Sequence, residues 1–350
     1  MRRLAFLSFA FVISIALHAQ SPDAYKSDPK FQKALAEAKQ LERTHRYAFA
    51  VDAYKKASKI AGGKDIVCLN DLYSLQFKIG SYKDAAQTAA SMLAIAANPS
   101  DRSISESNRG VALLLQAGDK GKAELLQSAH ESFQAAIADN PKNATAHFYD
   151  GKALARLNQL EAAGEQFKAC LSCLSPNDSF YVRAQHFAAN PSLSLSRMAP
   201  AFNVTALDGS HFNLDEMGGR VVLIDFWATW CGPCNRELPH MKKIAQEFAN
   251  EPFVIISVSW DSDEAKWKDF IAKNGMTWVQ YRDVDHSLSN AFGINAIPHY
   301  FTIDSDGVLT AEMMGEGSSV EGKLKKLIAK AKADREKVQT ATAGNWGAVP

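Results

Sequence analysis

The feature that most constrains the fold of this 350-residue chain is a repeated apolar pattern in its N-terminal half. Four apolar positions recur 34 residues later, with Leu126, Ala129, Phe133 and Ala136 returning as Leu160, Ala163, Phe167 and Cys170. The spacing of three or four residues within each set is that of one helix face. One helix pair cannot cover its own apolar face, so this period predicts helix–turn–helix units stacked into an array.

The same pattern appears nearer the N-terminus. A further set recurs after 35 residues, with Tyr47 and Ala50 returning as Tyr82 and Ala85. The units resemble tetratricopeptide (TPR) repeats, most clearly over residues 143–176. We therefore predict an all-α, TPR-like array over residues 26–189, and a non-repeat helical bundle is the alternative. The resemblance implies a protein partner on the concave face of the array.

The first residues have a different character. Two arginines precede an almost wholly apolar run over residues 4–17, and polar sequence follows. This run is shorter than the roughly 20 apolar residues of a membrane span and suits the core of a signal peptide. We predict a signal peptide over residues 1–19 and export to the periplasm or cell envelope. An uncleaved N-terminal membrane anchor is the alternative.

The C-terminal half alternates strand and helix patterns. It follows a Ser-rich stretch, residues 190–197, which we interpret as a linker. Buried strands are predicted at residues 221–226 and 253–260, helices at 231–248, 264–274 and 320–331, and a hairpin turn at 304–307. The predicted fold class is therefore two domains, a helical array and then an α/β domain over residues 198–333, with a flexible tail over 334–350.

Two cysteines in this half have the spacing of a disulfide-exchange site. Cys231 and Cys234 are separated by two residues and lie after a buried strand, where a helix begins. Unpaired N–H groups at a helix N-terminus stabilise a thiolate. We predict that Cys231 is the exposed nucleophile and that Cys234 resolves the mixed disulfide. Pro233 suits the first helical turn because it has no N–H to lose there.

An acidic residue lies close to this pair. Asp225 is in the apolar strand that precedes the cysteines. Burial raises the pKa of a carboxyl group, so we predict that Asp225 exchanges a proton with Cys234. A solvated strand end is the alternative interpretation.

Residues 226–234 resemble the active site of thioredoxins, and the wider pattern is similar to exported TlpA/ResA-type thiol–disulfide oxidoreductases. The similarity includes residues 199–202, residues 236–239 and an additional strand and helix at 253–278. It implies a thioredoxin fold, a central mixed sheet flanked by helices. It also implies a cis peptide bond at Pro298, facing the cysteines, although a trans turn proline is the alternative. The predicted substrate-binding residues are Trp230, Gly232, Pro233 and Ile297, where many relatives have Thr in place of Ile297.

The remaining cysteines and histidines suggest no second centre. Zinc requires four ligands, and no further ligand pair follows Cys234, so we predict no metal and no cofactor beyond the redox-active Cys231–Cys234 disulfide. Cys170 and Cys173 form another CxxC within a predicted helix, best interpreted as packed thiols or a structural disulfide. An auxiliary redox pair is the alternative. Cys68 has no evident partner.

Together these features predict an exported enzyme, a protein-disulfide reductase whose repeats recruit a partner or the substrate. By family analogy, a membrane or envelope electron donor reduces the cysteine pair again. The net charge of +1 gives no reason to expect nucleic acid as a partner. The alternatives are a TPR scaffold or adaptor whose thioredoxin domain mainly docks partners, and an oxidase or isomerase with the same site.

Overall fold

The computed structural model describes residues 24–344, apart from residues 119–120, 177, 179, 215–218 and 318–319 and the side chains of residues 337–344. The predicted signal peptide, residues 1–19, lies outside the described residues. The described chain divides into a helical unit that ends at Leu195 and an α/β unit that begins at Ser196. No helix in the described ranges is long and apolar enough to cross a membrane.

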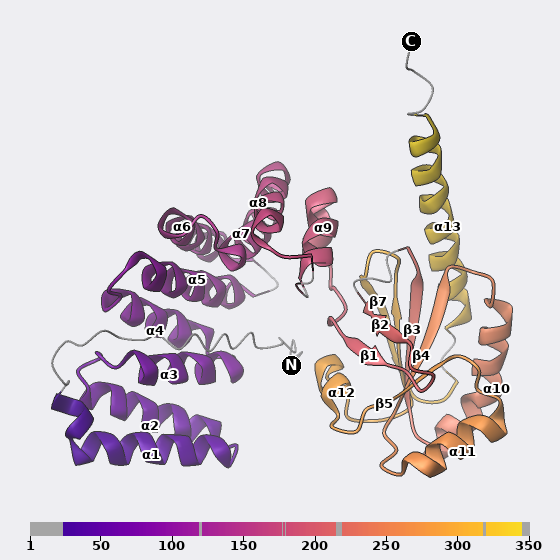
Figure 1. Cartoon of the computed structure of the whole chain (residues 1–350), viewed down its shortest axis with the longest axis horizontal. Coiled ribbons are helices and arrows are strands. Elements are labelled where there is room, and N and C mark those ends of the chain that lie inside the picture. Colours follow the sequence, from indigo (N-terminus) through magenta and orange to yellow (C-terminus); the bar gives the residue numbers. More distant parts are fainter. Residues whose placement is uncertain are drawn as a thin grey trace. The chain divides into compact units, whose positions relative to one another are not determined.

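In the helical unit, each helix packs against the next one along the chain (Figure 1). The elements are η1 (Ala24–Ser27), α1 (Pro29–Arg43), α2 (Tyr47–Ile60), α3 (Ile66–Lys78), α4 (Tyr82–Ala94), α5 (Pro99–Gln116), α6 (Ala123–Asp139), α7 (Ala144–Arg156), α8 (Leu160–Cys173) and α9 (Tyr181–Ala189). Most of the recurring residues identified from the sequence lie in the core, and Phe133 and Phe167 are fully buried, whereas Leu160 is exposed and Tyr47 and Tyr82 are half-buried. The predicted all-α domain is confirmed.

Glycines allow close contact between helices of one pair. Gly151 in α7 faces the ring of Phe167 in α8, and a Cβ atom added at this glycine would lie 2.7 Å from the ring. Gly110 in α5 faces Phe133 in α6 in the same way, with a corresponding distance of 2.5 Å. Both distances are far below normal van der Waals separation, so these pairs require a residue without a side chain.

Two predicted boundaries differ from the structure. Within the predicted linker, Pro191–Leu195 form a 3-10 helix, η2, which packs on α7, α8 and α9. The hydroxyl of Ser194 donates to the carbonyl of Pro191 at 2.7 Å, so a polar serine stabilises this turn. At the other end, helix α13 (Glu321–Gly344) continues into the predicted tail. This segment lacks an apolar stripe but is rich in Ala, Lys, Glu and Arg, which are strong helix formers.

The α/β unit contains a five-stranded mixed sheet and a separate two-stranded hairpin. The sheet order is β5-β4-β3-β6-β7, in which β3, β4 and β5 are parallel and β6 and β7 are antiparallel to their neighbours. The elements are β1 (Asn203–Thr205), β2 (His211–Asn213), β3 (Val221–Trp227), α10 (Gly232–Glu247), β4 (Phe253–Ser259), α11 (Glu264–Asn274), β5 (Val279–Arg282), α12 (Ser287–Phe292), β6 (His299–Ile303), β7 (Leu309–Met314) and α13. The predicted thioredoxin fold is confirmed.

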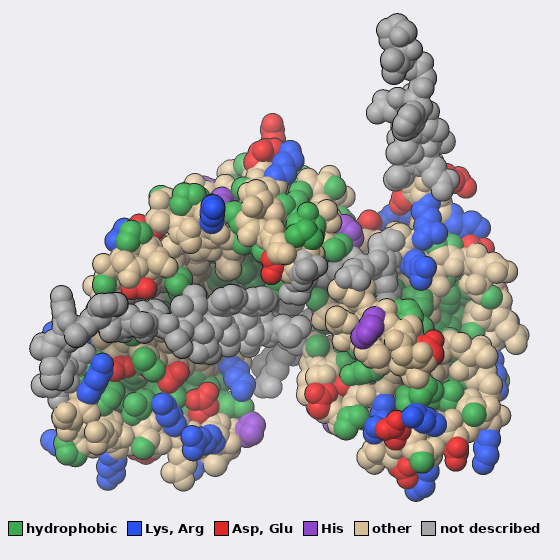
Figure 2. Space-filling model, viewed as in Figure 1, with side chains coloured by type: hydrophobic (Ala, Val, Ile, Leu, Met, Phe, Trp, Pro, Cys, Tyr) green, Lys and Arg blue, Asp and Glu red, His purple; other side chains and the backbone are tan. Residues whose placement is uncertain are grey.

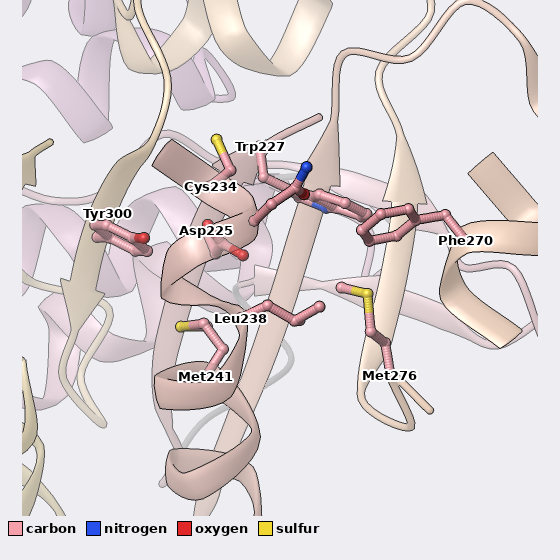
Figure 3. Close-up of a pocket in the computed structure, with 9 residues that line it drawn as sticks. Asp225, Trp227, Cys234, Leu238, Met241, Phe270, Met276 and Tyr300 are labelled. Carbon is pink, nitrogen blue, oxygen red and sulfur yellow. The ribbon is translucent and has the colours of Figure 1, made fainter. Parts of the chain in front are cut away.

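Strand β3 is buried on both faces, which explains its continuous apolar sequence. Its alternating residues enter two different cores. Ile224 and Phe226 pack with α12 and the β1–β2 hairpin, whereas Leu223 packs beneath α10 and α13. The alternation places Asp225 on the α10 face of the sheet, where it lines a cavity with Leu238 and Met241 of that helix (Figure 3).

The close contact at Gly151 leads to a stability prediction. Alanine would gain about 1 kcal/mol of helix propensity, but its methyl group would have to displace the buried ring of Phe167, and overpacking costs about 1–3 kcal/mol. We expect Gly151→Ala to lower the urea midpoint followed by far-UV circular dichroism. Gly322→Ala in α13 is the control, because a Cβ atom there meets nothing within 4 Å. Equal gains of stability in both variants would contradict the proposed packing.

Candidate redox site

Cys231 and Cys234 form a disulfide at the N-terminus of α10. Cys231 is the N-cap of this helix, and its sulfur accepts a hydrogen bond from the backbone N–H of Cys234 at 3.2 Å. Pro233 lies in the first helical turn, as predicted from its missing N–H. Strand β3 ends at Trp227, so the strand leads directly to the cysteine pair.

Both cysteines are buried in this oxidised form. Cys231 is 5% and Cys234 is 7% exposed. The prediction that Cys231 is exposed is therefore wrong for the disulfide state. The reason is tertiary packing, because both residues belong to an apolar cluster with Trp227 and Ala228, and Ile297 packs against it.

A buried carboxylate holds the loop that leads to Cys231. Asp261, which follows β4, accepts hydrogen bonds from the backbone N–H and the hydroxyl of Thr229 at 2.9 and 2.6 Å. The hydroxyl of Ser259 donates to the same carboxylate at 2.7 Å, and the Asn235 amide donates to the Thr229 carbonyl at 2.9 Å. These bonds fix the loop from both sides, and the side chain of Trp230, 65% exposed, lies next to the disulfide.

The Ile297–Pro298 peptide bond is cis, which agrees with the family resemblance. Pro298 is buried, and its carbonyl accepts a hydrogen bond from the backbone N–H of Gly315 at 3.0 Å. Ile297 is half-buried against the cysteine cluster. Of the other residues predicted to bind substrate, Gly232 is exposed like Trp230, and Pro233 is half-buried.

Asp225 is 5% exposed, which rules out a solvated strand end. Its carboxylate accepts a hydrogen bond from the hydroxyl of Ser257 at 2.9 Å. Burial raises the pKa of Asp225 to about 7, repulsion from Glu237 adds to this effect, and the Ser257 hydrogen bond opposes it. A carboxyl group with such a pKa can both accept and release a proton near neutral pH.

Asp225 and Cys234 line the same small cavity (Figure 3). Its volume is about 10 Å³, close to the minimum that a single water molecule requires. Trp227, Leu238, Met241, Phe270 and Met276 provide apolar walls, and Tyr300 and Asn235 complete the lining. The carboxyl of Asp225 and the sulfur-bearing Cys234 therefore border one space of about the size of a water molecule.

Glu237 is a second buried acid near the site, and it was not predicted as a site residue from the sequence. One of its carboxylate oxygens accepts the backbone N–H of Gly317 at 2.6 Å, and the other lies 3.2 Å from Nδ1 of His240. In the same loop, Glu316 forms a bidentate ion pair with Arg236. These contacts fasten the loop after β7 to α10. The sequence spacing could have indicated that Glu237 lies near the cysteines, because a residue three positions after Cys234 in a helix lies on the same helix face.

The described side chains form no group of three or more His, Cys, Asp or Glu residues that could hold a metal ion. His240 lies between Glu237 and Glu321, and His299 stacks on Phe301 with 4.9 Å between the ring centroids. His286 contacts the ring of Trp260 edge-on.

The other cysteines are free thiols within the helical unit. Burial raises the pKa of Cys68 and of Cys170 to about 12, so neither is a thiolate near neutral pH. Cys173 is half-buried at the end of α8.

A disulfide at the start of a helix, with a buried carboxyl group beside it on a mixed sheet, defines a thiol–disulfide oxidoreductase. The comparisons with known proteins agree. Residues 195–328 match the Redoxin family. The thiol-disulfide oxidoreductase ResA of Bacillus thuringiensis (strain Al Hakam) is 30% identical over 159 residues, which cover 45% of this chain and 92% of the relative. The chain belongs to the ResA-type thiol-disulfide oxidoreductases, and the Redoxin match begins where the α/β unit begins.

Other relatives are similar over the same kind of span. ResA of Bacillus subtilis (strain 168) is 26% identical over 129 residues, or 37% of this chain and 72% of the relative. Among solved structures, the thioredoxin domain of a thiol-disulfide oxidoreductase from Bacteroides vulgatus is 28% identical. That match covers 38% of this chain and 96% of the other, with a TM-score of 0.35.

The raised pKa of Asp225 predicts a pH-dependent stability. An unfolded aspartate has a pKa of about 3.9, so between about pH 4 and pH 7 only the folded form binds the proton, and stability falls as pH rises. We expect Asp225→Asn to stabilise the oxidised protein at pH 8, on the order of 4 kcal/mol, with this gain lost near pH 4.

Urea denaturation followed by tryptophan fluorescence measures this effect, because five of the six tryptophans lie between residues 227 and 278, in the described part of the α/β unit, and residues 24–195 contain none. An equal gain at pH 4 and pH 8 would contradict the prediction.

Proposed function

We propose that this protein is an exported reductant of disulfides in cell-envelope proteins, with Cys231 and Cys234 as its redox pair. The observation that supports this most directly is the cavity shared by the resolving cysteine, Cys234, and the buried carboxyl of Asp225. The apolar run at residues 4–17 supports export.

In the first step, the Cys231 thiolate, stabilised by the N-terminus of α10, attacks one sulfur of a substrate disulfide. The substrate S–S bond breaks, one substrate sulfur leaves as a thiolate that takes a proton from water, and a mixed disulfide with Cys231 forms. Asp225 then accepts the proton of Cys234. The resulting thiolate attacks the sulfur of Cys231, and the second substrate sulfur leaves as a thiolate that is protonated in turn. Two electrons have passed to the substrate, and the Cys231–Cys234 disulfide has formed.

The surface around the disulfide is suited to a peptide substrate. Exposed Trp230 and Gly232 lie on one side, and Ile297 precedes the cis-proline Pro298. In this proposal the indole of Trp230 packs on the substrate, and the backbone of Ile297 pairs with it as a strand would. A membrane or envelope electron donor then reduces the pair for the next cycle.

The helical unit has the architecture of a recruitment module. Its helices contact mainly their neighbours along the chain, so the array offers an extended surface for a protein partner. Acidic and basic side chains are interspersed on the face shown in Figure 2, which suits a protein better than a polyanion. The aligned residues cover 92% of the relative from Bacillus thuringiensis, so that relative has few residues outside the aligned region. It can therefore be compared with this chain to find what the helical unit adds.

Substitution of the two cysteines should separate their roles. We expect Cys231→Ser to abolish insulin-disulfide reduction, since the thiolate that attacks the substrate is lost, and Cys234→Ser to accumulate mixed disulfides in the source cells. Mass spectrometry of the trapped partners should identify envelope proteins. Cytoplasmic partners would contradict export, and wild-type activity in both variants would contradict the assigned roles. If residues 196–350 carrying Cys234→Ser fail to trap particular partners that the whole chain traps, that result would support recruitment by the helical unit.

The direction of electron flow follows from the reduction potential of the pair. With Cys68, Cys170 and Cys173 replaced by alanine, equilibration in dithiothreitol buffers should give a potential near about −270 mV, as for thioredoxin. A potential near about −120 mV is that of a strong oxidant and would overturn the proposed reductant.

A further inference from the structure

Asp225 belongs to a row of buried side chains that crosses four strands beneath α10. The strand register places Tyr300 of β6 and Ser257 of β4 opposite Asp225, and it places Gln280 of β5 opposite Ser257. All four residues are buried. Within the described residues the Gln280 amide has no hydrogen-bond partner, so Ser257 is the neighbour in this row that bonds to Asp225 and affects which charge state is accommodated.

Two hydrogen bonds in this layer have a defined direction. The indole N–H of Trp278 donates to the hydroxyl oxygen of Ser257 at 2.8 Å, and Ser257 donates to Oδ2 of Asp225 at 2.9 Å. An indole N–H can only donate. Trp278 therefore occupies a lone pair of the hydroxyl and leaves its proton directed at the carboxylate. This arrangement favours the ionised form of Asp225, which only accepts hydrogen bonds.

The other groups that face Asp225 act differently. Glu237 and Cys234 approach from α10, and Tyr300 approaches from β6. Burial and Glu237 raise the pKa of Asp225, whereas Ser257 alone among the described residues lowers it. No lysine, arginine or histidine in the described ranges forms an ion pair with this carboxylate. The interaction that stabilises the Asp225 carboxylate is therefore a hydrogen bond from a neutral hydroxyl.

We infer that Trp278 and Ser257 are positioning residues, whose hydrogen bonds stabilise the Asp225 carboxylate and thereby set the pH at which it can accept the proton of Cys234. This inference rests on the proposed role of Asp225 in the exchange reaction. Trp278 does not touch the reacting atoms and acts only through Ser257. Its contribution must therefore disappear when the Ser257 hydroxyl is absent.

The test is a double-mutant cycle on the oxidised full-length protein, in which neither Cys231 nor Cys234 titrates. The pKa of Asp225 is measured by NMR with carboxyl-¹³C aspartate. One hydrogen bond to a charged group corresponds to a shift of about one unit, so Ser257→Ala should raise the pKa of Asp225 by about that amount. Trp278→Phe should raise it by less, and the double variant should match Ser257→Ala.

Trp267→Phe is the matched control. Trp267 is buried in the apolar cluster of the cysteines, against which the half-buried Trp278 also packs, but within the described residues the indole N–H of Trp267 has no hydrogen-bond partner. This variant removes the same volume without removing a bond of the layer, and the pKa of Asp225 should stay unchanged. A shift equal to that of Trp278→Phe, or an undiminished Trp278→Phe effect in the Ser257→Ala background, would overturn the inference in favour of general packing. An unshifted pKa in Ser257→Ala would also overturn it.

A kinetic measurement then separates this inference from the proposed function. The rate at which Cys234 resolves a mixed disulfide should shift to higher pH in Ser257→Ala by the same amount as the pKa of Asp225, because the carboxylate is the form that accepts the proton. A shift in the NMR titration without a shift in this rate would refute the proton transfer to Asp225, and with it the catalytic part of the inference. The hydrogen-bonded pair itself would stand.

Discussion

The α/β unit depends on the pairing of β3 with strands on both sides. This strand is hydrogen-bonded to β4 and β6, all its residues are buried, and it leads into the loop that ends at Cys231. Its alternation fills one core with Ile224 and Phe226 and directs Asp225 to the other. Strand β3, which contributes to both cores, therefore also positions Asp225. Burying this ionisable group costs free energy and destabilises the central strand of the sheet.

The two units solve the problem of a buried carboxyl differently. Asp150 in α7 is fully buried, but Nδ1 of His130 lies 2.6 Å from one of its oxygens and the Gln134 amide donates to the other at 2.6 Å. These partners link α6 to α7 and oppose the effect of burial, which still raises the pKa of Asp150. Asp225 has one hydroxyl partner and an acidic neighbour instead. Its charge is incompletely compensated, which is the property that proton exchange requires.

The part of the site that could be predicted from the sequence lies within one short segment of the chain. Asp225, Cys231 and Cys234 follow one another through a strand, a loop and a helix start, so their proximity needs no knowledge of the tertiary fold. Ser257 and Glu237 were missed because their positions depend on strand register and on the packing of α10 over the sheet. The burial of Cys231 likewise depends on Ile297, which is distant in the chain. The helix over residues 334–344 was missed because it has no apolar stripe, although its composition favours helix.

The order of the units has a consequence for folding. Contacts in the helical unit join neighbouring helices, whereas β3 must pair with β6 through residues as distant in the chain as Val222 and Ile303. Local contacts form faster than distant ones, and N-terminal units generally fold first. Cys68 and Cys170 are buried by contacts between neighbouring helices, so their enclosure does not require the distant strand pairing that positions Cys231 and Cys234.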